Sequence, residues 1–596
     1  MNPVSVHTAR PAVSPWLWCV VAVLLAWGLK LPQFIGVVTE LRLPGNDDYF
    51  RLAQIRDWLA GAGWYDTGQP RLGIDGVAIH WTRLIDLPVA VLIAVLEPLA
   101  GLGTAEKTAV IAWPALLFLL AVRVLIALAR RIDPDLHPAL VAIVAGLSGP
   151  AIMQFEPGRI DHHNAQLLLM ALAALGATDP EARRGGALAG LACGLSLAIG
   201  LEALAPILVI GLFIALRWAW ALEQARRLAI FASVFTFTAT IGLAINLPPD
   251  EWGTALCDAL SVAYLGPLAA GSIPIVIATS LLRTKSTASR LALLTVAGAA
   301  SAVAMALIEP ACFGGPYAGL SQAARNGWLP QVAEAQPLVE SLRQTPMGLV
   351  PFLVVPLLSF GAAALVLAQT RDSVRSPAIL LTAIVATSFL LSFLQVRQGQ
   401  FLGLLSVPLI ACALPVLRRH VRRFAERASQ KAQIGTAALL AMLSAGALFA
   451  VTGNERPASA DNAPASRHRV LAACDSAHAA LHVAALPEAT IFNTYKISGP
   501  LIVRTSHRVL VGPYHRSEGA VLDGMTLLRG NPQAVRALAE RRGATHLALC
   551  LEPESAAFAR SLGPDGLAAR LSRGETFDWL TPLSGSGHLA LYQIAD

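Results

Sequence analysis

The residues best suited to chemistry in this chain form two polar islands at the ends of apolar runs. Asp47 and Asp48 follow the first apolar run, and Asp161, His162 and His163 follow a later one. Adjacent carboxylates at a membrane boundary are costly unless a cation neutralises them. They could also be an acidic helix start, which Asp favours. If both islands lie on one side of a membrane, they can form one site.

Carboxylates from separate loops, a neutral imidazole and an amide oxygen are a reasonable ligand set for Mg²⁺ or Mn²⁺. The predicted metal ligands are Asp47, Asp48, Asp161, His163 and Gln166. His162-His163 could instead cap a helix. A metal ion here would assist the departure of a phosphate leaving group at the membrane surface.

Two further polar features lie later in the chain. Gln331-Val332-Ala333-Glu334 lies in a long polar segment, 309–345, and Arg397 stands alone at the mouth of an apolar run. A lone Arg often anchors lipid headgroups, and a Glu in a polar loop is usually just solvated. An Arg near carboxylates also suits a phosphate, because its guanidinium binds oxygens in pairs. The predicted phosphate-binding residues are His80, Arg83, Arg159 and Arg397.

The composition is that of a polytopic membrane protein. Of 596 residues, 55% are hydrophobic and only 14% are charged, whereas soluble proteins carry about a quarter. The apolar runs lack the alternation of barrel strands, so the spans are predicted to be helices. The net charge of +7 lies mostly in short Arg clusters between apolar runs, which is an orientation signal and not a nucleic-acid signature.

The Arg clusters set the predicted topology. The first run, from Trp16, is longer than a signal-peptide core and is predicted to stay as a span. The short, Pro-bounded run 86–101 is predicted to lie at the interface, because counting it as a span would put the later Arg pairs outside. This gives about thirteen helices in residues 1–454, with a cytoplasmic N-terminus. The predicted outer loops are 41–106, 156–163 and 309–345.

Residues 467–596 are predicted to form a small soluble α/β domain on the outer, periplasmic face, after an Ala- and Pro-rich linker, 455–466. Strands alternate with helices in this part of the sequence. The predicted strands are 489–493, 508–512, 546–550 and 589–594, and the predicted helices are 532–542 and 554–562.

The seven cysteines contain no CxxC motif, so no zinc or redox motif is predicted. Cys257 and Cys312 lie near predicted outer helix ends, and Cys474 and Cys550 share the outer domain. An oxidising compartment permits both disulfides. Alternatively, these four cysteines are buried free thiols, and the sequence favours neither arrangement over the other.

In order along the chain, the polar features resemble the motifs of oligosaccharyltransferase catalytic subunits, which belong to the GT-C glycosyltransferase superfamily. Asp47-Asp48-Tyr49-Phe50 resembles the Asp-x-Tyr-Phe motif of the first outer loop, and Arg159-Ile160-Asp161-His162-His163 resembles the Asp-His-His motif of the second. Gln331-Val332-Ala333-Glu334 is similar to the motif ending in Glu within the mobile fifth outer loop, and Arg397 resembles the arginine that binds the donor pyrophosphate.

The resemblance implies that Asp47 and Asp161 bind the divalent metal and activate the acceptor. It implies that Glu334 closes a loop over the site, and that Arg397 holds the pyrophosphate of a polyprenyl-linked sugar donor. The predicted catalytic residues are therefore Asp47, Asp161 and Glu334. The chain departs from the family at Gln166, where a Glu is usual, and at Asp48, which replaces a small residue or Pro.

The C-terminal domain departs further from the family. It lacks the Trp-Trp-Asp-Tyr-Gly motif that reads the Ser/Thr of an acceptor sequon, and the comparable place is Phe492-Asn493-Thr494-Tyr495-Lys496. Strong sequon selectivity is not expected, since reading a hydroxyl needs a placed polar partner. Tyr514 is predicted instead to stack on a sugar, with His515 and Arg516 as acceptor-binding donors. Alternatively, the segment that contains these three residues is an ordinary turn.

These features predict a metal-assisted glycosyltransferase of the bacterial inner membrane. It would transfer a sugar or oligosaccharide from a polyprenyl-phosphate or polyprenyl-pyrophosphate carrier to a glycan, lipid or protein acceptor on the periplasmic face. One alternative is a single-sugar transferase that modifies lipid or polysaccharide. A different class, a transporter or flippase of lipid-linked sugar, would use the charges as a pathway through the bundle.

Overall fold

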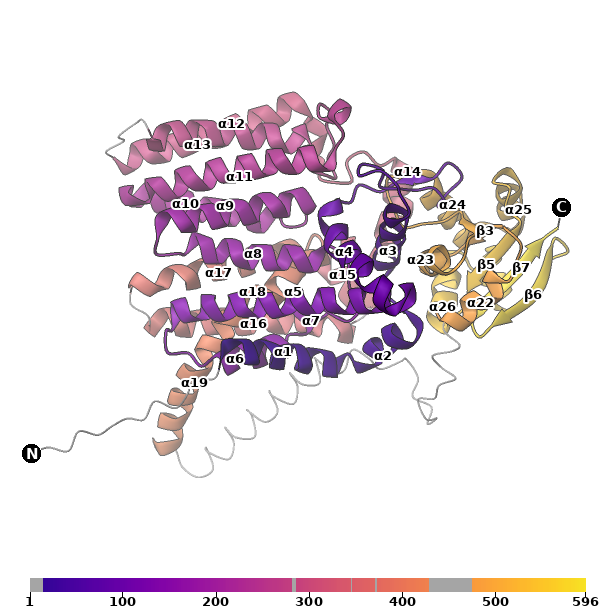
Figure 1. Ribbon diagram of the computed structural model, residues 1–596, viewed down its shortest axis with the longest axis horizontal. Coiled ribbons are helices and arrows are strands. Elements are labelled where there is room, and N and C mark those ends of the chain that lie inside the picture. Colours follow the sequence, from indigo (N-terminus) through magenta and orange to yellow (C-terminus); the bar gives the residue numbers. More distant parts are fainter. Residues whose placement is uncertain (1–13, 281–285, 345, 370–371, 428–473, 596) are drawn as a thin grey trace, which may run out of the picture.

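A bundle of roughly parallel helices and a smaller α/β domain make up the molecule (Figure 1). The computed structural model describes residues 14–280, 286–344, 346–369, 372–427 and 474–595. The α/β domain lies at one end of the bundle, and α3 (Asn46–Leu59) and α14 (Gln322–Gly327) lie between them (Figure 1).

Within the described residues, every apolar run predicted as a span is helical. The helices are α1 (Pro15–Leu29), α2 (Leu31–Glu40), α4 (Arg83–Ala100), α5 (Leu102–Ile132), α6 (Pro138–Gly146), α7 (Gly149–Ile152), α8 (His163–Ala177), α9 (Ala182–Ile199), α10 (Leu204–Trp220), α11 (Ala225–Asn246), α12 (Val262–Ser280), α13 (Thr287–Ile308), α16 (Pro346–Gln369), α17 (Asp372–Ser392), α18 (Gly399–Leu405) and α19 (Val407–Arg427). The last predicted span, 434–451, and the predicted linker, 455–466, lie outside the described residues.

Among the described helices, six are long and apolar enough to cross a membrane, or up to eight if each of two bent pairs forms one span. The bent pairs are α1 with α2, at 82°, and α18 with α19, at 48°. Helices α8 and α10 are shorter but apolar. The prediction of a polytopic helical membrane protein is confirmed, whereas the count of about thirteen is not. Helix α4, which covers the run 86–101, is not among the six, and its interfacial place stays a prediction.

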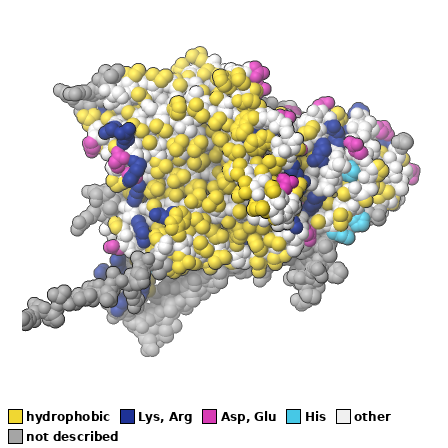
Figure 2. Space-filling model, viewed as in Figure 1, with side chains coloured by type: hydrophobic (Ala, Val, Ile, Leu, Met, Phe, Trp, Pro, Cys, Tyr) yellow, Lys and Arg dark blue, Asp and Glu magenta, His cyan; other side chains and the backbone are white. Residues whose placement is uncertain are grey.

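Basic side chains gather at the end of the bundle opposite the α/β domain (Figure 2). Arg130 and Arg131 lie in the last turn of α5, and Arg217 lies in the last turn of α10. Between α8 and α9, Asp179 pairs with Arg131 at 2.7 Å and with Arg184 at 3.0 Å. By the positive-inside rule this end is predicted to face the cytoplasm. The α/β domain would then be outside.

The C-terminal domain contains a five-stranded mixed sheet of order β4-β3-β5-β7-β6. Strand β3 is parallel to β4 and β5, and β7 is antiparallel to β5 and β6. The strands are β3 (Thr490–Asn493), β4 (Arg508–Val509), β5 (His546–Cys550), β6 (Leu580–Ser586) and β7 (Leu589–Ile594). All four predicted strands are present. Strand β6 was not predicted, because its Pro, Gly and Ser residues weaken the strand pattern.

Helices cover this sheet and connect its strands. Both predicted helices are present, as α25 (Pro532–Arg541) and α26 (Pro553–Leu562). The additional helices are α22 (Ala477–Ala484), α23 (Tyr495–Arg504), α24 (Glu518–Arg529) and α27 (Leu567–Ser572). The predicted α/β domain is therefore confirmed.

The C-terminal domain docks on α3 and on the first outer loop. The Asn46 amide donates to the Tyr495 carbonyl at 2.8 Å, and its oxygen accepts from the Gly499 N–H at 3.1 Å. A Cβ at Gly499 would lie 2.8 Å from that oxygen, so glycine permits this close approach. Leu72 of the first outer loop forms a parallel bridge to Val509 of β4. The loop thus continues the edge of the sheet.

Two disulfides fix the outer segments. Cys257–Cys312 joins the α11–α12 loop to the short helix η3 (Pro310–Gly314), and Cys474–Cys550 joins the segment before α22 to β5. The other three cysteines, Cys19, Cys193 and Cys412, are buried free thiols. The structure therefore contains both of the pairs that the sequence permitted.

The orientation can be tested with single cysteines at four exposed positions. Ala60→Cys and Gln533→Cys should react with a membrane-impermeant maleimide in intact cells, whereas Arg183→Cys and Arg418→Cys should react only after lysis. The native free thiols are buried and provide an unlabelled background. Labelling at position 183 in intact cells would contradict the predicted orientation.

Candidate active site

The first turn of α3 directs three consecutive side chains to three parts of the molecule, because successive helical residues are rotated by about 100°. Asn46 contacts the C-terminal domain. Asp48 is buried against the second outer segment, residues 156–163. Asp47 faces a cavity at the outer end of the bundle. There its carboxylate accepts a hydrogen bond from the Tyr514 hydroxyl at 3.0 Å.

Asp48 ties α3 to the second outer segment. Its Oδ1 accepts from the backbone N–H groups of Ile160, at 2.8 Å, and Asp161, at 2.9 Å. Its Oδ2 accepts from the Gly45 N–H at 3.0 Å and from Arg159 Nη1 at 3.3 Å. Burial raises the pKa of Asp48 to about 6, and Arg159 opposes this shift. Asp48 therefore positions two segments and does not line the cavity, and its role as a metal ligand stays a prediction.

Asp161 is held between two stacked imidazoles. It lies 2.5 Å from His163 Nδ1 and 2.6 Å from His162 Nδ1, and the ring centroids are 4.4 Å apart. Burial disfavours its charged form, but the two histidines outweigh this and hold the pKa of Asp161 well below its usual range. Burial likewise opposes a charged His162, yet Asp161 and Glu202 raise its pKa to about 10. His162 is therefore cationic at neutral pH.

Glu202 lines the cavity but was not predicted from the sequence. Its carboxylate lies 3.5 Å from His162 Nε2 and accepts from Gln166 Nε2 at 3.2 Å. Gln166 also donates to the Gly200 carbonyl at 3.0 Å. Gln166 thus holds Glu202 and does not line the cavity, and its role as a metal ligand stays a prediction. The sequence did contain a feature that could have pointed to Glu202, because it is a lone acid between two apolar runs at the predicted outer face.

Arg397 lines the same cavity from η6 (Val396–Gln398). Its Nη1 lies 3.8 Å from the Glu334 carboxylate, and its guanidinium lies 5.6 Å from the centre of the Tyr317 ring. Next to it, the Val396 N–H donates to the Gln336 carbonyl at 2.8 Å. This bond brings the Glu334 segment to Arg397. Among the described residues, Arg397 is the only Arg or Lys that lines this cavity.

The cavity has a volume of about 470 Å³. Its titratable lining is Asp47, Glu202, Asp258, Glu334, Arg397, His80, His162, His163 and His515, with the tyrosines Tyr264, Tyr317 and Tyr514. Burial raises the pKa of Asp47 to about 7, and the charges of Asp161 and Glu334 add to the shift. A divalent cation would relieve this repulsion, so Asp47 and His163 fit as its donors, with Asp161 behind His163. Because Asp161 holds His163 Nδ1, a metal would take Nε2.

Two predicted phosphate-binding residues lie elsewhere. The Arg83 guanidinium donates to the Asp86 carboxylate at 3.1 Å and to the Gln54 carbonyl at 3.2 Å. Arg159 is held by Asp48. Both arginines lie near the site in the sequence, but each has a buried partner on a neighbouring element. The structure brings His80 and Arg397 to the cavity and leaves Arg83 and Arg159 outside its lining.

The predicted acceptor-binding residues approach from the C-terminal domain. The Tyr514 ring packs edge-on against Phe50, at 5.1 Å, and Trp81, at 5.4 Å between centroids. Tyr514 is only 8% exposed, so little of its ring is open for a sugar to stack on. His515 lines the same cavity as Tyr514, and Arg516 lines a neighbouring cavity of about 480 Å³.

Archaeal oligosaccharyltransferases of known structure share this fold. AglB from Archaeoglobus fulgidus, in complex with an inhibitory peptide and a dolichol-phosphate, matches with a TM-score of 0.65 at 13% identity, over 98% of this chain and 74% of that one. The A. fulgidus oligosaccharyltransferase in complex with Zn and sulfate matches at 0.58 and 12% identity, over 96% and 73%. The same enzyme tethered with an acceptor peptide containing the NVT sequon matches at 0.56 and 14% identity, over 98% and 74%.

Neither a protein-family model nor a curated protein sequence matches the chain. The structural likeness confirms the predicted fold, which is that of archaeal oligosaccharyltransferases. At this identity it establishes the fold, and an account of the function has to come from the site.

The stabilities of the Asp48→Asn and Asp47→Asn variants should differ, because Asp48 positions two segments whereas Asp47 faces the cavity. Asp48→Asn removes the charge that pairs with Arg159, and breaking a buried ion pair typically costs about 3–5 kcal/mol. Asp47→Asn keeps an acceptor oxygen for Tyr514 and should cost no more than about 1 kcal/mol. Thermal unfolding of the purified variants would compare them. Equal stabilities would contradict the role assigned to Asp48.

Proposed function

We propose that this chain is a membrane glycosyltransferase of the bacterial inner membrane. It transfers a sugar or oligosaccharide from a polyprenyl-phosphate or polyprenyl-pyrophosphate carrier to an acceptor on the periplasmic face, with the help of Mg²⁺ or Mn²⁺. The observation that carries this proposal is one cavity lined by Asp47, His163 and Arg397, with Asp161 behind His163 at 2.5 Å.

The charges in the cavity match such a donor. Arg397 offers a planar fork that can bind two phosphate oxygens, and His162 adds a second positive charge. Glu202 and Glu334 lie beside these cations and hold them in place until the phosphate arrives. A bound divalent metal would stabilise negative charge on the departing phosphate, an effect worth several kcal/mol.

The acceptor group attacks the anomeric carbon, and the bond from that carbon to the phosphate oxygen breaks. The phosphate leaves with both bonding electrons. Asp47 faces the cavity and accepts a hydrogen bond from Tyr514, so it is placed to orient the acceptor group and take up its proton. Asp161 keeps His163 in one orientation through its contact at 2.5 Å, as carboxylates do for metal-binding histidines.

The site favours transfer over transport. The charged residues that line the cavity come from α3, from the loops at this end of the bundle, from η6 and from the C-terminal domain. A transport pathway would place charges along the middle of the bundle. The likeness to AglB with a dolichol-phosphate supports a polyprenyl-linked donor for this fold.

Metal removal and an Asp161→Asn substitution test the proposal directly. Turnover of a polyprenyl-linked sugar by the purified protein should fall at least about a hundredfold in EDTA and in Asp161→Asn, as expected when several kcal/mol of transition-state stabilisation are lost. Asp75→Asn, which changes an exposed acid of the first outer loop, is the control. Full activity in EDTA would refute the metal, and full activity of Asp161→Asn would refute the site.

The acceptor preference gives a second test. The segment Phe492 to Lys496 forms the end of β3 and the start of α23, where the Thr494 hydroxyl accepts from the Cys550 N–H at 3.3 Å and Lys496 pairs with Glu552. These groups are already occupied, so they offer no partner for a sequon hydroxyl. Peptides with Asn-x-Ser/Thr should be poor acceptors. Efficient transfer to such a peptide, lost when its Asn is changed to Gln, would contradict this expectation.

A further inference from the structure

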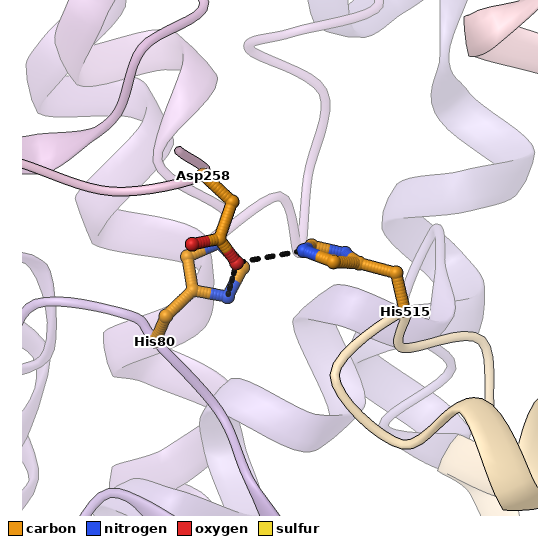
Figure 3. A group of neighbouring side chains, drawn as sticks. All are labelled: His80, Asp258 and His515. Atoms are coloured by element: carbon orange, nitrogen blue, oxygen red, sulfur yellow. Dashed lines mark hydrogen bonds and ion pairs between the residues drawn. The ribbon is translucent and has the colours of Figure 1, made fainter. Parts of the chain in front are cut away.

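Three side chains from distant parts of the sequence converge at one edge of the cavity. His80 comes from the first outer loop, Asp258 from the α11–α12 loop, and His515 from the C-terminal domain (Figure 3). The Asp258 carboxylate lies 2.7 Å from His515 Nε2 and 3.9 Å from His80 Nδ1. One nitrogen or oxygen atom from each of the three residues lies within 4.8 Å of the others.

Two of these side chains, those of Asp258 and His515, follow residues that are held in place. Asp258 follows Cys257, whose disulfide to Cys312 fixes the α11–α12 loop. His515 follows Tyr514, which is bonded to Asp47. Such supported side chains make a preorganised ligand set, because little further ordering is needed when an ion binds.

We propose that His80, Asp258 and His515 form a binding site for a transition-metal ion such as Zn²⁺. Two imidazoles and one carboxylate are ligands that Zn²⁺ prefers, whereas Mg²⁺ prefers oxygen ligands. Ligand atoms about 2.0–2.1 Å from a tetrahedral Zn²⁺ lie roughly 3.3 Å from one another. The present distances of 2.7 Å and 3.9 Å lie on either side of that value, so small side-chain rotations complete the geometry.

The surroundings suit an exchangeable ion. All three residues line the cavity of about 470 Å³, so a fourth coordination position opens into it and is available to water or a ligand oxygen.

Arg516 shapes the site without blocking it. It donates to both Asp258 oxygens, at 2.7 and 2.8 Å. Oδ1 keeps a second lone pair for a metal, and Oδ2 gains one when His515 Nε2 turns from it to the ion. Hydrogen bonds of this kind orient ligating carboxylates in metal sites. The positive charge of Arg516 also weakens binding, which favours an ion that exchanges with solution over a permanent one.

This site is separate from the Mg²⁺ or Mn²⁺ position of the proposed function, since it shares no ligand with Asp47, Asp161 and His163. It does not depend on the reaction, because a bound ion would first of all join two outer loops to the C-terminal domain. A ligand that binds only the folded, docked form raises the unfolding temperature.

Zn²⁺ binding to the full-length, tag-free protein tests the proposal. In saturating Mg²⁺, equilibrium dialysis followed by metal analysis should show one Zn²⁺ whose affinity falls at least tenfold in His515→Ala and in Asp258→Asn. His137→Asn, which changes an exposed histidine at the start of α6 and keeps a capping side chain, should bind like wild type. Asp47→Asn should keep the site. X-ray absorption of the wild-type complex should show nitrogen and oxygen ligands at about 2.0–2.1 Å.

Two results would overturn the proposal. One is wild-type Zn²⁺ affinity in both His515→Ala and Asp258→Asn, which would mean that the ion binds elsewhere and that the three residues form only a hydrogen-bonded contact. The other is an absence of Zn²⁺ binding to the wild-type protein, a result that does not depend on how the variants fold. Neither result bears on glycosyl transfer, which is measured separately.

Discussion

A single buried carboxylate, that of Asp48, connects the parts of this protein that meet at the outer end of the bundle. It receives two backbone N–H groups from the second outer segment, one from the start of its own helix, and the charge of Arg159. A buried carboxylate without such partners would be strongly destabilising. With them, α3 has one allowed rotation relative to the Ile160–Asp161 backbone. That rotation leaves Asp47 facing the cavity and Asn46 facing the C-terminal domain.

The C-terminal domain completes the site that α3 begins. Asn46 binds the start of α23, and Leu72 extends the sheet at Val509. With the domain in this place, Tyr514 reaches Asp47 and His515 reaches Asp258. The cavity therefore has walls from the membrane bundle, the outer loops and the outer domain, so its chemistry depends on all three.

Much of this arrangement could be predicted from the sequence. The order of Asp47, Asp161, Glu334 and Arg397 matched a motif series, and the Arg clusters indicated which helix ends lie together. Three of these four residues line the cavity, and Asp161 lies behind it, bonded to His163.

The direction of individual side chains could not be predicted. Asp47 and Asp48 are adjacent and chemically identical, yet only contacts with a distant segment decide which one is buried. Arg83 and Arg159 lie beside motif residues but satisfy Asp86 and Asp48.

Glu202 and Asp258 were missed for a related reason. Each is an acid in a connection between apolar helices, where a solvated surface acid is the ordinary expectation. Their importance comes from partners that are remote in sequence, His162 for Glu202 and His515 for Asp258. Pattern reasoning recognises clusters that are local in the chain, whereas these clusters form only in the folded structure.

The pool of polyprenyl-linked sugar in cells tests the central claim most directly, because it reports on use of the donor without assuming an acceptor. Lipid extracts from cells that lack the gene, and from cells that carry wild-type or Asp161→Asn protein, would be compared by mass spectrometry. The account predicts that a polyprenyl-linked sugar accumulates without the gene, returns to its normal level with the wild-type protein and stays high with Asp161→Asn. A pool that does not change without the gene, or that Asp161→Asn restores as well as wild type does, would contradict the account.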